Sequence, residues 1–352
     1  LQSIQDTVPT PACVCNQSVA RPYSTAQRGP IKIMHLTMGI FAMILVGSLV
    51  LMVGAVPLDW TQLLAGDSLG QTILWQLRLP RVLLAGLVGG GLALAGASVQ
   101  GLFRNPLADP TLIGVAGGAA LAAAICIAVA PLLLANPWWI AGAAFFGGLT
   151  VTFLVLAISG RETALHTLLL AGLAVNAVSL ALVGLIGVLV VDESFRSIAF
   201  WTLGSLNHAT WEEVVVALLM LPLAWRLIYR AEALNAMVLS EHEFSSLGYS
   251  SQSIRREVIV LVAAMTGIAV SLTGVIAFVG LIVPHMARIA FGAMHQTLLP
   301  LAFMMGAMLM MLADAASRSL ISPMEIPIGI ITALIGAPVF IALLRKQAVS
   351  DD

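Results

Sequence analysis

"RVLLAGLVGGGLALAGASVQGLF" spans Arg81–Phe103 and has no charged side chain after its first residue. A helix needs about 20 apolar residues to cross the hydrocarbon core of a bilayer, and this run is long enough. Small residues recur at every fourth position within it, at Gly89, Ala93, Ala97 and Gly101. Such a face lets neighbouring helices approach closely in lipid. The stretch therefore predicts a membrane helix that packs against other helices.

The rest of the chain has the same character. Of its 352 residues, 60% are hydrophobic and 9% charged, and the mean hydropathy is +1.01. A chain of this composition cannot cover a soluble surface. The predicted fold class is an all-α integral membrane protein with ten helices, near 33–56, 81–103, 112–134, 138–159, 165–191, 212–229, 256–274, 275–292, 297–317 and 326–344. The eighth is short and is interrupted by Pro284.

The basic residues predict the orientation. An even number of spans puts both termini on one side, and 12 of the 16 Lys and Arg residues then fall on that side. Cytoplasmic loops carry the excess of positive charge, so both termini are predicted in the cytoplasm. The four exceptions fall at the outer ends of spans and are Arg78, Arg81, Arg196 and Arg318.

Residues 1–32 differ from the remainder, since they are rich in proline and poor in large apolar side chains. They predict a disordered tail before the ten-helix membrane domain at 33–347. Cys13 and Cys15 lie in this tail and Cys126 lies within a span. This spacing suits neither a zinc site nor a disulfide framework, and no metal or cofactor is expected.

The sequence lacks the motifs that would power or catalyse a reaction. No glycine-rich phosphate loop precedes either of its two lysines, Lys32 and Lys346. The zinc-protease pattern that starts at His242 fails, because position 246 is serine. The chain is therefore not expected to be an enzyme. An ion-coupled carrier would bury acids in its spans, but only Asp314 lies well inside one, at the (i, i+4) spacing that suits an ion pair with Arg318.

The predicted cytoplasmic loop 230–257 concentrates ionisable residues that lipid would not tolerate. It contains one helix-like piece, a stop at Gly248, and a second piece with Arg255 and Arg256. This pattern predicts a two-helix platform for a partner protein. The alternative is an ordinary solvated loop.

Six separate blocks of the sequence then resemble one family, the permeases of type II ABC importers, which take up iron-siderophores, haem and cobalamin. The likeness runs from about residue 33 to 345. The blocks are "RLPR" at 78–81, "QGLFRNPLADP" at 100–110, "LLLAGLAVNA" at 168–177, "GVIAFVGLIVPHMAR" at 274–288, "LADAASR" at 312–318 and "EIPIGIITALIGAPVFIALLR" at 325–345.

The resemblance implies a homodimer in the bacterial inner membrane, with two cytoplasmic ATPase subunits and a periplasmic substrate-binding protein. No nucleic-acid partner is implied. The loop at 239–256 would dock on the ATPase, and the residues that carry this coupling role would be Glu241, His242, Glu243, Ser246, Leu247 and Gly248.

The resemblance also assigns gates and a docking surface. The cytoplasmic gate would comprise Asn105, Leu107, Leu165 and His166. Histidine at 166 departs from the small hydroxyl residues of the cobalamin relatives, and an interfacial capping role is the alternative to a substrate contact. Path-lining or interhelical hydrogen bonding is expected of Gln100 and Asn176, and docking of the binding protein is expected at Arg78, Arg81 and Arg318.

The substrate expected from the resemblance is haem, because the segment 190–211 is more similar to haem permeases than to cobalamin permeases. Ferric siderophore and cobalamin are the alternatives within the family. Outside it, an ion-coupled secondary transporter and a non-transporting scaffold stay open as remote alternatives. Trp201 and Trp211 are expected to anchor the chain at the membrane interface.

Overall fold

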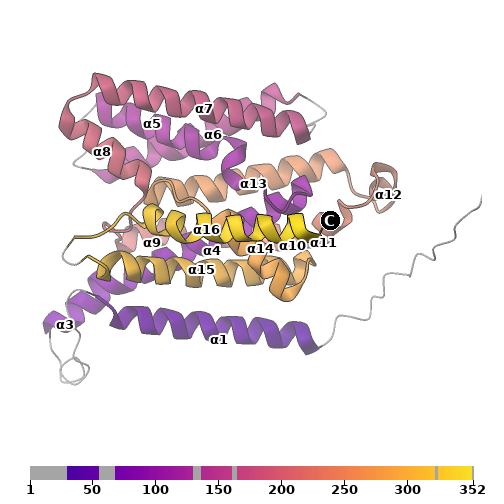
Figure 1. Ribbon diagram of the computed structural model, residues 1–352, viewed down its shortest axis with the longest axis horizontal. Coiled ribbons are helices and arrows are strands. Elements are labelled where there is room, and N and C mark those ends of the chain that lie inside the picture. Colours follow the sequence, from indigo (N-terminus) through magenta and orange to yellow (C-terminus); the bar gives the residue numbers. More distant parts are fainter. Residues whose placement is uncertain (1–29, 55–67, 130–135, 161–164, 322–323, 351–352) are drawn as a thin grey trace, which may run out of the picture.

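The computed structural model describes residues 30–54, 68–129, 136–160, 165–321 and 324–350, and every regular element in these ranges is a helix. Figure 1 shows the long helices running side by side along one axis. In chain order the elements are α1 (Pro30–Met52), α3 (Ser68–Thr72), the π-helical turn η2 (Ile73–Arg78), α4 (Leu79–Phe103), the 3₁₀ turn η3 (Pro110–Ile113), α5 (Val115–Val129), α6 (Pro137–Ile158), α7 (Leu165–Leu189), α8 (Asp192–Leu203), α9 (Trp211–Ala217), α10 (Met220–Tyr229), α11 (Ala231–Ala236), α12 (Glu241–Ser246), α13 (Ser251–Thr273), α14 (Val279–Phe291), α15 (His295–Ser319) and α16 (Ile328–Ser350).

The predicted all-α membrane fold is confirmed. Among the described residues, six helical runs are long and apolar enough to span a membrane: Ile33–Met52, Ser68–Phe103, Pro137–Ile158, Thr167–Leu189, Ser251–Thr273 and His295–Ser319. Shorter apolar helices at Val115–Val129, Val279–Phe291 and Ile328–Ala342, together with the α9–α10 pair, occupy the other predicted positions. The total of ten crossings stays a prediction.

Three predicted boundaries were wrong. The second span extends back to Ser68, because α3, η2 and α4 form one continuous helical run. The span at 212–229 is two helices, since α9 ends at Ala217 and α10 begins at Met220. The piece expected after Gly248 is not a separate short helix. It forms the first turns of α13, and the side chain of Ser250 caps the start of this helix. The helix then continues to Thr273, because its sequence contains no proline that would end it.

The centre of the fold is α4, which is buried over almost its whole length. It packs against α13, α14 and α15. A β-carbon on Gly89 would overlap the Gly306 carbonyl of α15, and one on Gly96 would overlap the Gly280 carbonyl of α14. The small residues of α4 are therefore packing residues, as the sequence predicts, because only glycine permits such close backbone approach.

A second group of helices, α5, α6 and α7, lies on the other side of α13 (Figure 1). A β-carbon on Gly147 of α6 would overlap Gly118 of α5, so these two helices also pack through glycine. The outer faces of α1 and α7 are apolar and uncovered, with Phe41 69% and Val188 82% exposed. Surfaces of this kind belong against lipid or another subunit, because apolar patches of this extent are rare in water.

The bundle has two distinct ends. Figure 1 places the start of α1 and the end of α16 at the end that carries α12, called here the α12 end. The opposite end carries α3 and α8 and is called the α8 end. Both termini of the bundle thus share one side, as an even number of crossings requires. Residues 1–29 of the predicted tail lie outside the described residues, and α1 begins at Pro30.

Candidate functional site

At the α12 end, the charged stretch 241–243 begins a short helix. The hydroxyl of Ser240 accepts a hydrogen bond from the backbone N–H of Glu243 at 3.4 Å, while the Glu243 carboxylate accepts from the hydroxyl and backbone N–H of Ser240 at 2.8 and 3.0 Å. This capping box satisfies groups that a helix start leaves unpaired. The same two bonds lower the pKa of the Glu243 carboxyl. The side chain of Glu241 lies outside the described residues.

One buried aromatic side chain holds α12 to the body of the protein. Phe244 is buried, and its ring centroid lies 5.4 Å from that of Tyr249. Phe244 shares a small crevice with Leu102 near the end of α4 and with Met237. The Phe244 side chain therefore lies close to the end of α4, and α12 itself packs on α13.

The outward side of α12 has the composition of a protein contact. Val238 is 74% and Leu247 57% exposed, and His242 and Ser246 are exposed beside them. Gly248 follows with φ of +82°, a left-handed conformation that ends the helix. Exposed apolar side chains interspersed with polar ones suit a surface that another protein covers.

A second connection joins the α12 loop to α4. Arg104 ends α4 with φ of +51°, in the left-handed region that non-glycine residues rarely adopt. Its Nη2 donates a hydrogen bond to the carbonyl of Leu239 at 3.1 Å. The backbone just before α12 is thus tied to the residue that opens the "RNPLADP" segment.

That segment folds into two tight turns at the α12 end. The side-chain oxygen of Asn105 accepts a hydrogen bond from the backbone N–H of Leu107 at 2.9 Å. Asp109 in turn caps η3 by accepting from the N–H of Thr111 at 2.8 Å. Side chains that bond to nearby backbone fix turns of this kind.

The other predicted gate residues lie at the start of α7. Leu165 and His166 form its first turn, and their side chains lie outside what the structure describes. Figure 1 shows the start of α7 at the α12 end. Farther along α7, a β-carbon on Gly172 would overlap the Leu112 carbonyl, so α7 and η3 are in contact. Asn105 and Leu107 lie in the loop just before η3, so the two predicted gate segments adjoin elements that touch.

The two polar residues predicted within spans make interhelical contacts. Gln100 is buried, donates to the Leu281 carbonyl at 3.0 Å, and accepts from Arg288 at 3.4 Å. Asn176 packs against Gly117, and its buried side-chain oxygen has no hydrogen-bond partner among the described residues. Interhelical bonding is confirmed for Gln100, and path-lining stays a prediction for both.

At the α8 end, the outer arginines form an internal network. Arg81 Nε lies 2.8 Å from Asp314 Oδ1, and its Nη2 lies 2.9 Å from Glu325 Oε2. Arg318 Nε lies 3.0 Å from Asp314 Oδ2, which confirms the (i, i+4) pair. Arg81 also donates to the side chain of Asn207 at 3.3 Å. One buried carboxylate thus joins α4 to α15, and Arg81 extends the network to two further loops.

The end of α1 completes this network. Arg78 Nη1 donates to the carbonyls of Leu51 and Met52 at 2.7 and 3.1 Å, and Arg318 Nη1 donates to that of Val53 at 3.2 Å. Positive charge is favourable at the carboxyl end of a helix, where carbonyl groups lack partners. The arginines therefore fasten α1 to the bundle.

This arrangement differs from the outward display that the sequence predicts. Arg78, Arg81 and Arg318 are only 5%, 8% and 8% exposed. Two of them point inward because they pair with Asp314, which is buried on α15. A docking role for them stays a prediction.

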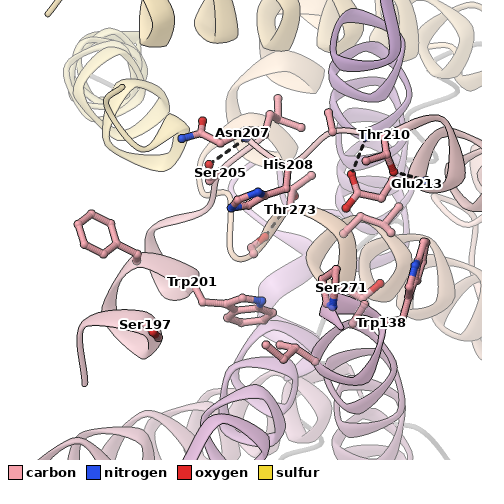
Figure 2. A pocket seen from close by; sticks show the side chains of 18 of the residues that line it. Trp138, Ser197, Trp201, Ser205, Asn207, His208, Thr210, Glu213, Ser271 and Thr273 are labelled. Atoms are coloured by element: carbon pink, nitrogen blue, oxygen red, sulfur yellow. Dashed lines mark hydrogen bonds between the residues drawn. The ribbon is translucent and has the colours of Figure 1, made fainter. Parts of the chain in front are cut away.

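A cavity of about 1540 Å³ opens at the α8 end, between α8, the start of α6, the loop before α9 and the end of α13. Figure 2 shows Trp138, Trp201, His208, Ser271 and Thr273 around it. Trp201 is half-buried on its wall, and its role as an interfacial anchor stays a prediction. Trp211 instead donates its indole N–H to the carbonyl of Trp75 at 2.9 Å.

The sequence reasoning missed several residues at this end. Glu325 and Asn207 are partners of Arg81, but both are far from it in the chain, and no sequence spacing predicts the contacts. His208 lies on the cavity in the segment 204–210, where no periodic pattern marks it. At the α12 end, by contrast, the spacing of Ser240 and Glu243 is a recognisable capping signal.

Comparisons with known structures support this architecture. A solved structure described as an inward-facing conformation of a metal-chelate type ABC transporter superimposes with a TM-score of 0.82 at 35% identity, covering 89% of this chain and 99% of that one. A second structure, of PsaBC from Streptococcus pneumoniae, shares the fold with a TM-score of 0.53 at 15% identity, over 77% of this chain and 92% of that one.

Comparisons of sequence agree. The hemin transport system permease protein HmuU of Yersinia pestis is 41% identical over 77% of this chain and 82% of its own length. The vitamin B12 import system permease protein BtuC of Vibrio parahaemolyticus is 37% identical over 87% and 92%. The profile of the FecCD transport family matches residues 40–346. The chain therefore belongs to the FecCD transport family and is a permease of the type II ABC importer architecture.

Proposed function

We propose that this permease carries haem across the bacterial inner membrane in an ATP-driven importer. The observation that carries the proposal is the 41% identity to a hemin permease. A cobalamin permease is 37% identical over a larger share of the chain, so cobalamin is an alternative. The likeness to a metal-chelate transporter keeps ferric siderophores as the other alternative.

The proposed assembly is a homodimer with two cytoplasmic ATPase subunits and a periplasmic binding protein. The sequence contains no glycine-rich phosphate loop, and the family is one of permease subunits, so hydrolysis would belong to the partner. The exposed apolar side chains that flank α12, Val238 and Leu247, support a partner contact there. The uncovered apolar face of α7 supports a subunit contact.

The proposed orientation puts the α12 end in the cytoplasm. The positive-inside bias of 12 in 16 basic residues supports it. Both termini of the bundle lie at that end, which agrees with cytoplasmic termini (Figure 1). The α8 end, with its cavity, would then face the periplasm and the binding protein.

In this proposal, ATP binding moves α12, and α4 transmits the movement to the gate. Phe244 packs beside the end of α4, and Arg104 binds the Leu239 carbonyl. The turns at Asn105 and Leu107 follow Arg104 directly. Rearrangement of those turns against the start of α7, at Leu165 and His166, would open the inner mouth.

We also propose that the outer arginines contribute to docking of the binding protein. Acidic side chains of the partner would have to compete with Asp314 and Glu325 for Arg81 and Arg318. Glu325 is the more exposed of these carboxylates, with 32% of its side chain accessible, and is therefore the easier one to displace. Arg78 would take part through its position beside the same network.

Growth tests the substrate. Bacteria that possess this importer as their sole route for iron should grow on haemin, and should lose this growth when the permease is deleted. The matched culture receives a ferric siderophore at equal iron. Growth on the siderophore with none on haemin would show that the substrate is the ferric siderophore. Growth on neither iron source would favour cobalamin as the substrate.

A further inference from the structure

The cavity at the α8 end is large, partly apolar and bordered by aromatic rings. Its volume of about 1540 Å³ exceeds the roughly 300–1,000 Å³ that is usual for small-molecule sites. Trp138, Phe200 and Trp201 lie on its border. Trp138 is held in place because its indole N–H donates to Glu212 at 3.1 Å. A broad, flat, apolar molecule would fit such walls.

One side chain in this cavity can coordinate a metal through neutral nitrogen. The lining residues include His208 but no cysteine, methionine or tyrosine. His208 is exposed, and within the described part of the chain its ring makes no hydrogen bond. Figure 2 shows its ring directed into the cavity above Trp201. Both ring nitrogens therefore remain available to a ligand.

The loop that carries His208 is held by several backbone bonds. Gly204 has φ of +72°, and its carbonyl accepts from Ile328 at 3.1 Å. Ser205 N donates to the Thr273 carbonyl at 2.8 Å, and Asn207 N donates to the Ser205 hydroxyl at 3.1 Å. Because α13 and α16 hold this loop, the backbone that carries His208 is in place before any ligand arrives, which favours binding.

Among the charged side chains that line the cavity, one arginine is placed to bind an anionic group of a ligand. Five carboxylates line it, but three are engaged: Glu325 with Arg81, Glu212 with Trp138, and Glu213 with Thr210. Asp192 and Glu193 lie in the first turn of α8, where the helix dipole favours negative charge. Arg196 also lines the cavity and forms no ion pair within the described residues. A carboxylate of the ligand could bind it.

We propose that His208 is an axial ligand for the iron of haem while haem occupies this cavity. The imidazole would donate its lone pair to an open axial position of Fe(III) and displace a water or a departing ligand, with no change of oxidation state. Imidazole is a usual axial ligand of haem iron. A siderophore that saturates its iron with oxygen atoms leaves no such position. This inference rests on the proposed function.

Absorption spectroscopy tests the assignment on the full chain in lipid nanodiscs. Haemin titrated into the unmodified protein should give a saturable shift of the Soret band. His208→Ala should lose this shift and bind haemin at least about tenfold more weakly, the scale at which perturbing a metal site lowers affinity. Added imidazole should restore the band in His208→Ala, which a merely structural role of the side chain would not produce.

Two controls separate ligation from general damage. His35→Ala removes a histidine of α1 whose ring lies tilted against Phe291, with centroids 5.3 Å apart, and should leave the Soret shift intact. Iron-free protoporphyrin should bind the unmodified protein and His208→Ala equally. An identical Soret band and affinity with and without His208 would overturn the inference, and haemin uptake by the same protein would show that the proposed function survives it.

Discussion

At the α8 end, Arg81 and Arg318 are buried and both pair with the buried Asp314. At the α12 end, His242 and Glu243 are exposed, and within the described part of the chain Glu243 bonds only to the start of its own helix. Both ends lie at the borders of an apolar bundle, and both contain charges that lipid would exclude. The difference is in what surrounds the charge. At the α8 end the charged side chains join distant helices. At the α12 end they lie on the surface of a short helix that is held by the buried Phe244.

The comparison indicates that charge in this permease has two separate uses. Buried ion pairs hold helices in place, and their loss exposes an uncompensated charge inside protein. Exposed charges contribute little to stability and are available to a partner. Substitutions at the α8 end should therefore change stability first, and those at the α12 end should change coupling first.

The largest expected effect is on Asp314. Asp314→Asn would leave Arg81 and Arg318 without their shared carboxylate. Breaking a buried pair in this way costs about 3–5 kcal/mol, so the melting temperature of the purified permease should fall strongly. The matched control is Glu257→Gln at the α12 end, which weakens the pairs with Arg226 and Arg230 and should lower the melting temperature less, because water reaches these side chains more than it reaches Asp314. Equal losses would contradict the difference between the ends.

The next effect concerns Arg104. Arg104→Ala removes the hydrogen bond to Leu239 and so loosens α12 from the gate segment. A loss of about 1 kcal/mol of coupling corresponds to about fivefold, and substrate transported per ATP hydrolysed should fall by that factor while assembly persists. Arg104→Lys keeps a donor and should retain most of the coupling. An unchanged ratio in the alanine variant would refute this connection.

A smaller effect is expected from Glu325→Gln, which weakens the internal hold on Arg81 without removing the arginine. If Arg81 binds acids of the binding protein, docking should become faster, most visibly at low salt, because exposed charges act mainly on association rates. Association kinetics across a salt series measure this. Rates identical to those of the unmodified permease would limit Arg81 to its structural role.

The smallest effect should come from Glu243. Glu243→Lys removes the capping box as well as the charge, whereas Glu243→Gln keeps an acceptor for Ser240 and removes only the charge. Because the pKa of Glu243 is lowered in the folded protein, its capping contribution is present above the pKa of an unfolded carboxyl and is lost as pH falls through the lowered value. Capture of the ATPase by the glutamine variant should therefore become insensitive to pH in this range. If both variants fail to capture the ATPase, the negative charge of Glu243 itself would be what the ATPase binds.

Patterns between residues that are close in the sequence predicted much of the fold. The apolar runs placed the long helices, and the spacing of Gly89 and Ala93 predicted the close packing of α4. The Asp314–Arg318 pair followed from (i, i+4) spacing and is present at 3.0 Å. Patterns of this kind work because the residues involved are neighbours on one helix.

Long-range pairing could not be predicted. Arg81 binds partners 233 and 244 positions away, and nothing near it in the chain indicates that it is buried. Likewise, His208 reaches the cavity only because its loop bonds to α13 and α16. The missed capping box of Ser240 is different, because its signal is local and was available from the sequence.

Transport in reconstituted vesicles shows whether this permease imports haem at the expense of ATP. The permease would be reconstituted with its ATPase and its binding protein, and haemin uptake would be followed with ATP, without ATP, and with an ion gradient alone. Haemin should accumulate only with ATP, and the permease without its ATPase should be inactive. Accumulation on an ion gradient alone would contradict this expectation.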